Sequence, residues 1–165
     1  MEINKKVIIK KNPNGDTRTA AKNVSFSDFQ EANDMHIKDV RSTMTILASY
    51  LRQKGIEHDW TKKEKEKEFY EDFLSTMNDG TNFVEGDWYQ YHIKEERHHL
   101  TSRCPIDVNL FDVIEMITDC VCAGKARSGK IRNLEIDDKM LKDAMKNTVE
   151  LINKIVVVEG EDEDE

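Results

Sequence analysis

Residues 27–55 read SDFQEANDMHIKDVRSTMTILASYLRQKG, and this stretch determines the predicted fold class. Its apolar side chains recur at intervals of three and four residues, the spacing of one face of an α-helix: Phe29, Ala32, Val40, Met44, Leu47 and Leu51. Ser25 or Ser27 can cap the start, and Gly55 follows the last periodic residue. The stretch predicts a long amphipathic helix, with His36 on its apolar stripe and pointing inward.

Three further segments show helical periodicity, namely residues 62–78, 109–124 and 137–158. The first of them ends at Asp79-Gly80, and residues 88–100 are typical of a shorter helix or a helix followed by a loop. Before residue 25, two short extended stretches flank the turn sequence Asn12-Pro13-Asn14-Gly15, which predicts a small β-hairpin. We therefore expect a mainly α protein with a small N-terminal β-hairpin.

The chain of 165 residues fits one domain of common size. We expect a hairpin appendage over residues 1–24, a helical domain over 25–157 and a disordered acidic tail over 158–165, where the sequence ends in EGEDEDE. The net charge of −8 argues against a protein that binds long nucleic acids by neutralising phosphates. Short nucleotides are still compatible with a local basic pocket.

The N-terminal sequence MEINKKVIIKK lacks the apolar core of a signal peptide, and no segment has the length and apolarity of a membrane span. The three cysteines, Cys104, Cys120 and Cys122, are an odd number in a chain without a secretory signal. The cysteine count favours reduced thiols and a cytoplasmic protein. Without a membrane span, we expect no binding to membranes.

Five histidines are the main candidates for chemistry: His36, His58, His92, His98 and His99. His58 is followed directly by Asp59, and the segment HIKEERHH carries the last three histidines. A later helical segment adds Asp112, Glu115 and Asp119. Imidazole nitrogens together with carboxylate oxygens form the ligand set preferred by Mn, Fe, Co, Ni and Zn.

The order His, His-Asp, His, His-His and a final Asp on a helix resembles the HD-domain superfamily of metal-dependent phosphohydrolases. HDWTK is similar to the His-Asp-x-x-Lys element of that superfamily, which corresponds to His58, Asp59 and Lys62. The additional histidines resemble those of the two-metal HD-GYP phosphodiesterases, but the Gly-Tyr-Pro signature is absent. Taken together, HDWTK, HIKEERHH and LFDVIEMITDC are similar to an uncharacterised HD-like group of bacterial and phage proteins.

The resemblance implies an HD-like helical bundle that holds a divalent transition metal, with two ions expected. The implied metal ligands are His36, His58, Asp59, His92, His98, His99 and Asp119. Asp112 is an alternative to Asp119, although one ion does not readily take both, because seven helical residues span about 10 Å. Asp59 and Lys62 are the implied catalytic residues, with Asp59 bridging the ions and Lys62 acting on the substrate phosphate.

Lys94 and Arg97, which lie near the histidines in sequence, are candidates for binding that phosphate, as is Arg127. Arg127 belongs to GKARSGK, residues 124–130, which has P-loop spacing but lacks the final Ser or Thr and follows a helix instead of a strand. The predicted function is hydrolysis of a small phosphoester, with a nucleotide as the expected substrate. The alternatives are an HD-like metal-binding or regulatory protein without catalysis, and a helical interaction module with structural histidines.

Overall fold

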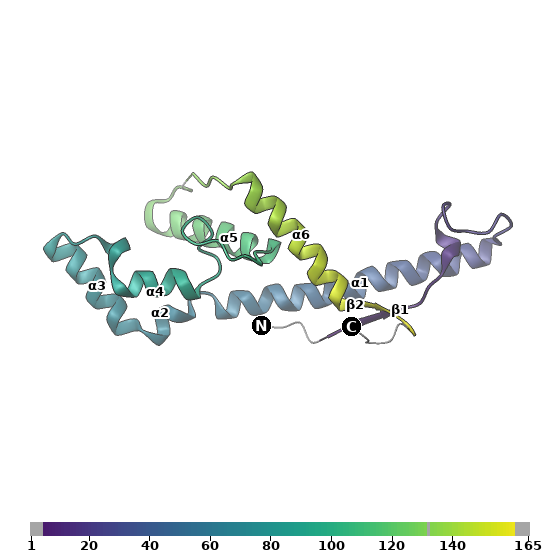
Figure 1. Cartoon of the computed structure of the whole chain (residues 1–165), viewed down its shortest axis with the longest axis horizontal. Coiled ribbons are helices and arrows are strands. Elements are labelled where there is room, and N and C mark those ends of the chain that lie inside the picture. Colours follow the sequence, from purple (N-terminus) through teal and green to yellow (C-terminus); the bar gives the residue numbers. More distant parts are fainter. Residues whose placement is uncertain (1–4, 132, 161–165) are drawn as a thin grey trace. The chain divides into compact units, whose positions relative to one another are not determined.

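The computed structural model describes residues 5–131 and 133–160, and within them the chain is mainly α-helical (Figure 1). In chain order the helices and strands are β1 (Val7–Ile9), a 3₁₀ turn (Pro13–Gly15), α1 (Phe26–Glu57), α2 (Trp60–Glu64), α3 (Glu66–Asp79), a 3₁₀ turn (Phe83–Glu85), α4 (Asp87–Glu95), α5 (Leu110–Ser128), α6 (Asp138–Ile155) and β2 (Val156–Val158). The predicted fold class, mainly α, is confirmed. Of the predicted acidic tail, residues 161–165 lie outside the described residues.

The predicted N-terminal β-hairpin is wrong. The turn sequence forms a 3₁₀ turn, in which the Asn12 side chain accepts a hydrogen bond from the Asn14 backbone at 3.1 Å. β1 pairs instead with β2 as a parallel two-stranded sheet, with Val7 opposite Val156 and Ile9 opposite Val158 (Figure 1). Three consecutive valines at the end of the predicted last helix thus provide a β-branched strand, which suits a sheet better than a helix.

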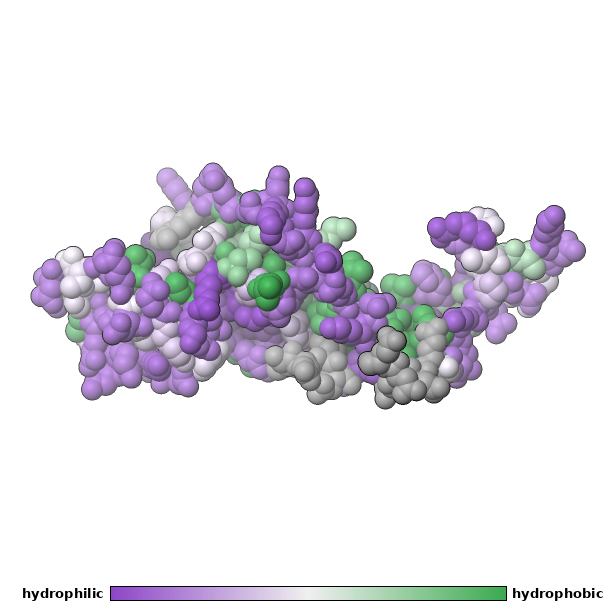
Figure 2. All heavy atoms as spheres, viewed as in Figure 1, coloured by the Kyte–Doolittle hydropathy of each residue, from purple (hydrophilic) through white to green (hydrophobic). Residues whose placement is uncertain are grey.

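Helix α1 begins where the sequence indicates, because the Ser25 hydroxyl accepts the Asp28 backbone N–H at 3.1 Å. It continues through Gly55 and ends at Glu57, so the glycine does not terminate it. The apolar stripe of α1 is largely exposed, including Phe29, Val40 and Met44. His36 is exposed as well, so the expectation that it points inward is wrong. The face drawn in Figure 2 is mainly hydrophilic, with smaller hydrophobic areas.

The predicted helix over residues 62–78 is divided into α2 and α3 at Lys65, whose backbone leaves the helical region (φ −122°, ψ 48°). α3 ends at Gly80, which has the left-handed conformation (φ 68°) that glycine adopts without strain. Trp88 of α4 is buried and stacks on Phe69 of α3, with ring centroids 4.0 Å apart. Helices α2, α3 and α4 therefore pack together.

Helices α5 and α6 share an apolar core. Asn109 forms a capping box with Asp112 at the start of α5, and Gly129 ends the helix with φ 71°. Buried apolar residues of both helices and of the preceding loop pack together: Leu100, Val108, Val113, Met116, Met140 and Ala144. Two side-chain bonds add to this packing, since Thr148 accepts the Leu110 backbone N–H at 2.9 Å and Asn147 donates to the Val108 carbonyl at 2.8 Å.

The chain divides into two compact units. One consists of Met1–Arg52 with Val149–Glu165, and the other of Gln53–Thr148. The second unit contains the end of α1, all of α2 to α5 and the first part of α6. It also contains four of the five histidines, all except His36.

Candidate metal centre

The junction between α1 and α2 consists of His58 and Asp59. Asp59 has a left-handed backbone (φ 58°, ψ 28°) and is the one non-glycine residue with positive φ in the described part of the chain. Aspartate tolerates this conformation better than most residues because its side chain is short and polar. Backbone outliers of this kind cluster at functional sites. The junction sets the directions of both side chains, which lie partly buried.

The other histidines come from the end of α4 and from the loop that follows it. His92 lies in the last turn of α4, and the chain then leaves the helix at Glu96. Tight turns follow, in which the Leu100 N–H donates to the His98 carbonyl at 2.9 Å. His92 and His98 are each only 2 % exposed. The loop therefore folds its two consecutive histidines back toward α4.

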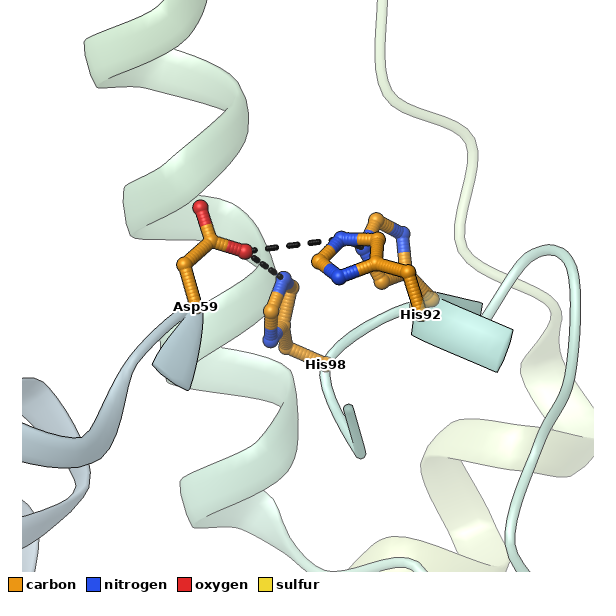
Figure 3. A group of neighbouring side chains, drawn as sticks. Asp59, His92 and His98 are labelled. Atoms are coloured by element: carbon orange, nitrogen blue, oxygen red, sulfur yellow. Dashed lines mark hydrogen bonds and ion pairs between the residues drawn. The ribbon is translucent and has the colours of Figure 1, made fainter. Parts of the chain in front are cut away.

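Asp59, His92, His98 and His99 form one group of converging ligand atoms. Asp59 Oδ1 lies 3.5 Å from His92 Nε2 and 3.6 Å from His98 Nε2, and Figure 3 shows the three side chains pointing toward one another. His99 Nε2 lies 2.7 Å from His92 Nε2. One ligand atom from each of the four residues lies within 4.8 Å of all the others.

These distances and the unsatisfied polar atoms fit a metal ion. Four atoms bound tetrahedrally at about 2.1 Å are about 3.4 Å apart, close to the spacings around Asp59 Oδ1. Asp59 Oδ1 and His98 Nε2 are both buried and have no hydrogen-bond partner among the described residues. A buried carboxylate oxygen and imidazole nitrogen without partners are costly, and a shared cation would satisfy both. The group could therefore hold a metal ion.

Two more groups adjoin the first. His58 Nε2 lies 3.4 Å from the other Asp59 oxygen, Oδ2, and 3.5 Å from Asp119 Oδ1. His58, Asp59 and Asp119 meet the same criterion of converging ligand atoms, as do His58, His98 and Glu115. The two oxygens of Asp59 therefore face two different sets of ligands.

Glu115 lies next to the Nδ1 atoms of His58 and His98, on the opposite side of each ring from Nε2. Its Oε1 atom accepts from His58 Nδ1 at 3.1 Å and lies 3.3 Å from His98 Nδ1. Its Oε2 atom accepts from Lys54 Nζ at 3.1 Å. A carboxylate that binds the Nδ1–H of a histidine leaves Nε2 free to bind a metal, and it also fixes the orientation of the ring. Glu115 thus orients the Nε2 atom of His58 toward Asp59, and it lies close to His98 Nδ1, which has no hydrogen-bond partner among the described residues.

Hydrogen bonds and burial shift the pKa values of three histidines of the site in opposite directions. Hydrogen bonds to Asp119 and Glu115 raise the pKa of His58 to about 10. The hydrogen bond between His58 and Asp119 also lowers the pKa of Asp119 to about 2. Burial lowers the pKa of His92 to about 3 and that of His99 to about 4, aided in each case by a neighbouring histidine. His92 and His99 are therefore neutral near pH 7, the form that binds metals.

Asp112, on the same helix as Glu115 and Asp119, pairs with Arg97 from the loop after α4 and shares Lys54 with Glu115. Asp112 is fully buried and accepts from Lys54 Nζ at 2.7 Å, from Arg97 Nε at 3.0 Å and from Arg97 Nη2 at 2.8 Å. The hydrogen bond to Asp112 raises the pKa of Arg97 against the effect of burial. The structure therefore brings Asp119, and not Asp112, to the histidines. Arg97, predicted to bind phosphate, is paired with Asp112 and Asp107.

The remaining predicted residues differ in where they lie. Lys62 is close to the group and forms an ion pair with Asp59 Oδ2. Lys94 is exposed beside Glu95, and Arg127 is exposed in the last turn of α5. His36 belongs to the other unit and is in none of the three ligand groups found among residues 5–131 and 133–160. The structure thus gathers His58, Asp59, Lys62, His92, His98, His99 and Asp119.

Four residues around the site were missed by the sequence reasoning as site residues: Lys54, Thr61, Glu96 and Glu115. Glu115 carried a signal, because it lies on the helix face between Asp112 and Asp119. Thr61 and Glu96 carried a weaker one, since they lie within the HDWT and EERHH segments. Lys54 had none, because a lysine near a helix C-terminus is ordinary.

In the described part of the chain, no helix has the length and apolarity needed to cross a membrane. Fold and site together define a mainly helical protein with a buried histidine and carboxylate group that could bind a metal. The chain belongs to the family described as "Family of unknown function (DUF5662)", whose family model matches residues 25–157. Searches of curated proteins and of solved structures found no match.

Proposed function

We propose that this protein is a metal-dependent phosphohydrolase that acts on a small phosphoester, with a nucleotide as the expected substrate. We further propose that two divalent transition metal ions bind, from among Mn, Fe, Co, Ni and Zn, and that the protein acts in the cytoplasm. The observation that carries the proposal is the position of Asp59. Its Oδ1 atom faces His92 and His98, while its Oδ2 atom faces His58, which in turn contacts Asp119.

A carboxylate whose two oxygens each face imidazole nitrogens can serve as a ligand that bridges two metal ions. Hydrolytic two-metal sites place their ions about 3.5 to 4 Å apart, a distance that one bridging carboxylate spans. His92, His98 and His99 would hold one ion, and His58 and Asp119 the other. Bound cations supply a coordinated water of lowered pKa and offset the charge on the phosphoryl oxygens.

The chain's own residues would then act on substrate and water. Hydrolysis forms a bond between the water oxygen and phosphorus, breaks the ester P–O bond and leaves a proton for the departing oxygen. Lys62 lies beside Asp59 and is only partly buried, so its ammonium group can turn from Asp59 Oδ2 to a substrate phosphate. Glu115 and Lys54 keep the rings of His58 and His98 in place during the reaction.

A second candidate function is a metal-binding or regulatory protein without catalysis. It is favoured by the cations near the group, because Arg97 and Lys54 are bound to Asp112 and Lys62 is bound to Asp59. A phosphate would have to compete with these carboxylates for each cation. The two candidates therefore differ in whether Lys62 is available to a substrate.

The test is a panel of phosphomonoesters and phosphodiesters, including nucleotides, assayed with added Mn²⁺ on protein purified without a histidine tag. We expect turnover of at least one substrate. Lys62→Ala should lower it by about 100-fold or more, the scale of losing one positioned electrostatic group, while bound metal stays at the wild-type level. Lys63→Ala is the matched control, because Lys63 is exposed and pairs only with Glu66 among the described residues. Metal binding without any turnover would favour the second candidate.

A further inference from the structure

A buried chain of hydrogen bonds lies behind His92, on the ring edge away from Asp59. Thr61 Oγ1 lies 2.6 Å from His92 Nδ1 and 2.7 Å from Glu96 Oε1. Thr61 is fully buried, and His92 and Glu96 are 2 % and 4 % exposed. The three side chains come from α2, from α4 and from the residue that follows α4.

The direction of these hydrogen bonds follows from the donors available. Glu96 Oε1 accepts a hydrogen bond from the Thr61 backbone N–H at 3.0 Å. The Thr61 hydroxyl contacts the same Glu96 oxygen. A carboxylate has no proton to give, so the Thr61 O–H must donate to Glu96. The Thr61 oxygen then has lone pairs to accept a proton from His92 and none to give to it. His92 must therefore carry its proton on Nδ1.

This arrangement determines what His92 presents to the rest of the site. With the proton on Nδ1, the Nε2 atom carries a lone pair. This atom lies 2.7 Å from His99 Nε2, whose N–H can donate to it, and 3.5 Å from Asp59 Oδ1. A divalent cation among these three atoms would take the place of the His99 proton and would attract both the imidazole lone pair and the carboxylate. We propose that Thr61 and Glu96 are positioning residues, which hold His92 as the Nδ1–H tautomer so that Nε2 can bind a divalent cation.

The Nδ1 atoms of three histidines contact carboxylates in two ways, directly or through a hydroxyl group. His58 and His98 have a carboxylate directly behind them, Glu115, at 3.1 and 3.3 Å. His92 reaches its carboxylate through a hydroxyl group, and Glu96 Oε2 also lies 3.9 Å from His98 Nδ1. Removing a residue that hydrogen-bonds a metal ligand commonly lowers metal affinity by about 10- to 100-fold. The inference rests on the metal site of the proposed function, but not on the hydrolysis of any substrate.

The first test is the tautomer of His92 in metal-free wild-type protein, measured from the ¹⁵N shifts of its ring nitrogens by NMR. We expect a protonated Nδ1 and an unprotonated Nε2. The opposite tautomer would overturn the proposal, whatever the variants do. This measurement needs neither metal nor substrate, so it stands even where a variant fails to fold.

The second test compares Thr61→Val with Thr61→Ser by titration with Zn²⁺ or Mn²⁺. Valine has nearly the shape of threonine but lacks the hydroxyl, whereas serine keeps it. We expect Thr61→Val to bind the cation about 10- to 100-fold more weakly and to lose the uniform Nδ1–H tautomer of His92, and Thr61→Ser to match the wild type in both. Equal affinity and an unchanged tautomer in Thr61→Val would overturn the proposal. If both tests succeed and no phosphoester is hydrolysed, the proposed function fails and the positioning role stands.

Discussion

Two aspartates of the same unit, the buried Asp112 and the partly buried Asp59, have opposite surroundings. Asp112 is fully buried, and its oxygens accept hydrogen bonds from Lys54, from Arg97 and from the Asn109 backbone. Asp59 has Lys62 on Oδ2, while its Oδ1 atom is buried without a hydrogen-bond partner in the described part of the chain. The chain itself satisfies the first carboxylate, which makes Asp112 structural. The second faces imidazole nitrogens and could take a metal ion as its partner.

The largest expected effect comes from removing the unsatisfied carboxylate. Asp59→Ala deletes the carboxylate that faces the Nε2 atoms of His58, His92 and His98, so bound metal should fall to background, by more than the roughly 100-fold typical of losing a supporting residue. Asp119→Ala should also lower metal content strongly, because Asp119 contacts His58. Elemental analysis of the purified variants measures both. Full metal content in Asp59→Ala would break the contrast between the two aspartates.

Asp112→Ala should act on stability instead. Its removal leaves the partly buried Lys54 and Arg97 with only Glu115 and Asp107 as partners, and we expect a loss of about 2 to 3 kcal/mol in the free energy of unfolding, below the roughly 3 to 5 kcal/mol of a fully buried pair. Urea denaturation measures this loss, and metal content should change less than in Asp119→Ala. Asp107→Ala is the control, since Asp107 is exposed and pairs with the same arginine, Arg97. Its removal should lower the free energy of unfolding by less than about 1 kcal/mol. A strong loss of metal with little loss of stability would assign the ligand role to Asp112.

Glu115 joins the two environments, because it contacts His58 and Lys54. Glu115→Gln keeps the shape of the side chain but weakens its hold on the imidazole N–H groups. We expect affinity for Zn²⁺ or Mn²⁺ to fall by about 10- to 100-fold in a calorimetric titration. Thr118→Ala, on the exposed side of the same helix, should leave the affinity unchanged. An unchanged affinity in Glu115→Gln would mean that His58 and His98 do not depend on this carboxylate.

The smallest expected effect is a loss of stability in mild acid. Burial holds the pKa of His92 at about 3 and that of His99 at about 4, below the ordinary value of 6.5. As the pH falls below about 6.5, the unfolded chain binds protons that the folded chain does not, so the metal-free protein loses stability down to about pH 4 through His99 and to about pH 3 through His92. After allowance for solvent screening, we expect unfolding at pH 5 to need about 1 to 2 kcal/mol less than at pH 7.

A variant of a single histidine checks the origin of this acid effect. His99→Gln should reduce the dependence on pH, because it removes one of the two histidines whose pKa burial lowers. The elevated pKa of His58, about 10, works in the other direction: its stabilising ion pairs are fully present below pH 6.5 and are lost only as the pH rises through about 10. Equal stability at pH 5 and pH 7 would contradict the buried, neutral state of His92 and His99.

Local sequence signals predicted the helices well where the deciding contacts were local. The Ser25 cap and the Gly80 terminus depend on neighbouring residues, and both lie where the sequence indicates. The hairpin failed because the strand that pairs with β1 lies at the other end of the described chain, in Val156–Val158. The inward position of His36 failed for a related reason. Periodicity identifies one face of a helix but not whether anything covers it.

The site was predictable only as far as ligand chemistry shows in the sequence. Histidines and an Asp-containing helix mark a candidate metal group, and His58, Asp59 and His98 do converge. The residues that orient the rings were harder to assign, because a threonine such as Thr61 has only a weak sequence signal until the fold places it between His92 and Glu96. Arg97 was misread for the same reason, since its partner Asp112 becomes apparent only in three dimensions.

The most direct test of the central claim is the metal content of wild-type protein purified without a histidine tag, together with its thermal stability. We predict at least one transition metal ion per chain and a rise in the unfolding temperature on adding Mn²⁺, Ni²⁺ or Zn²⁺, because the folded chain holds the ligands together and the unfolded chain does not. Substoichiometric metal with no thermal shift for any of these ions would contradict the account.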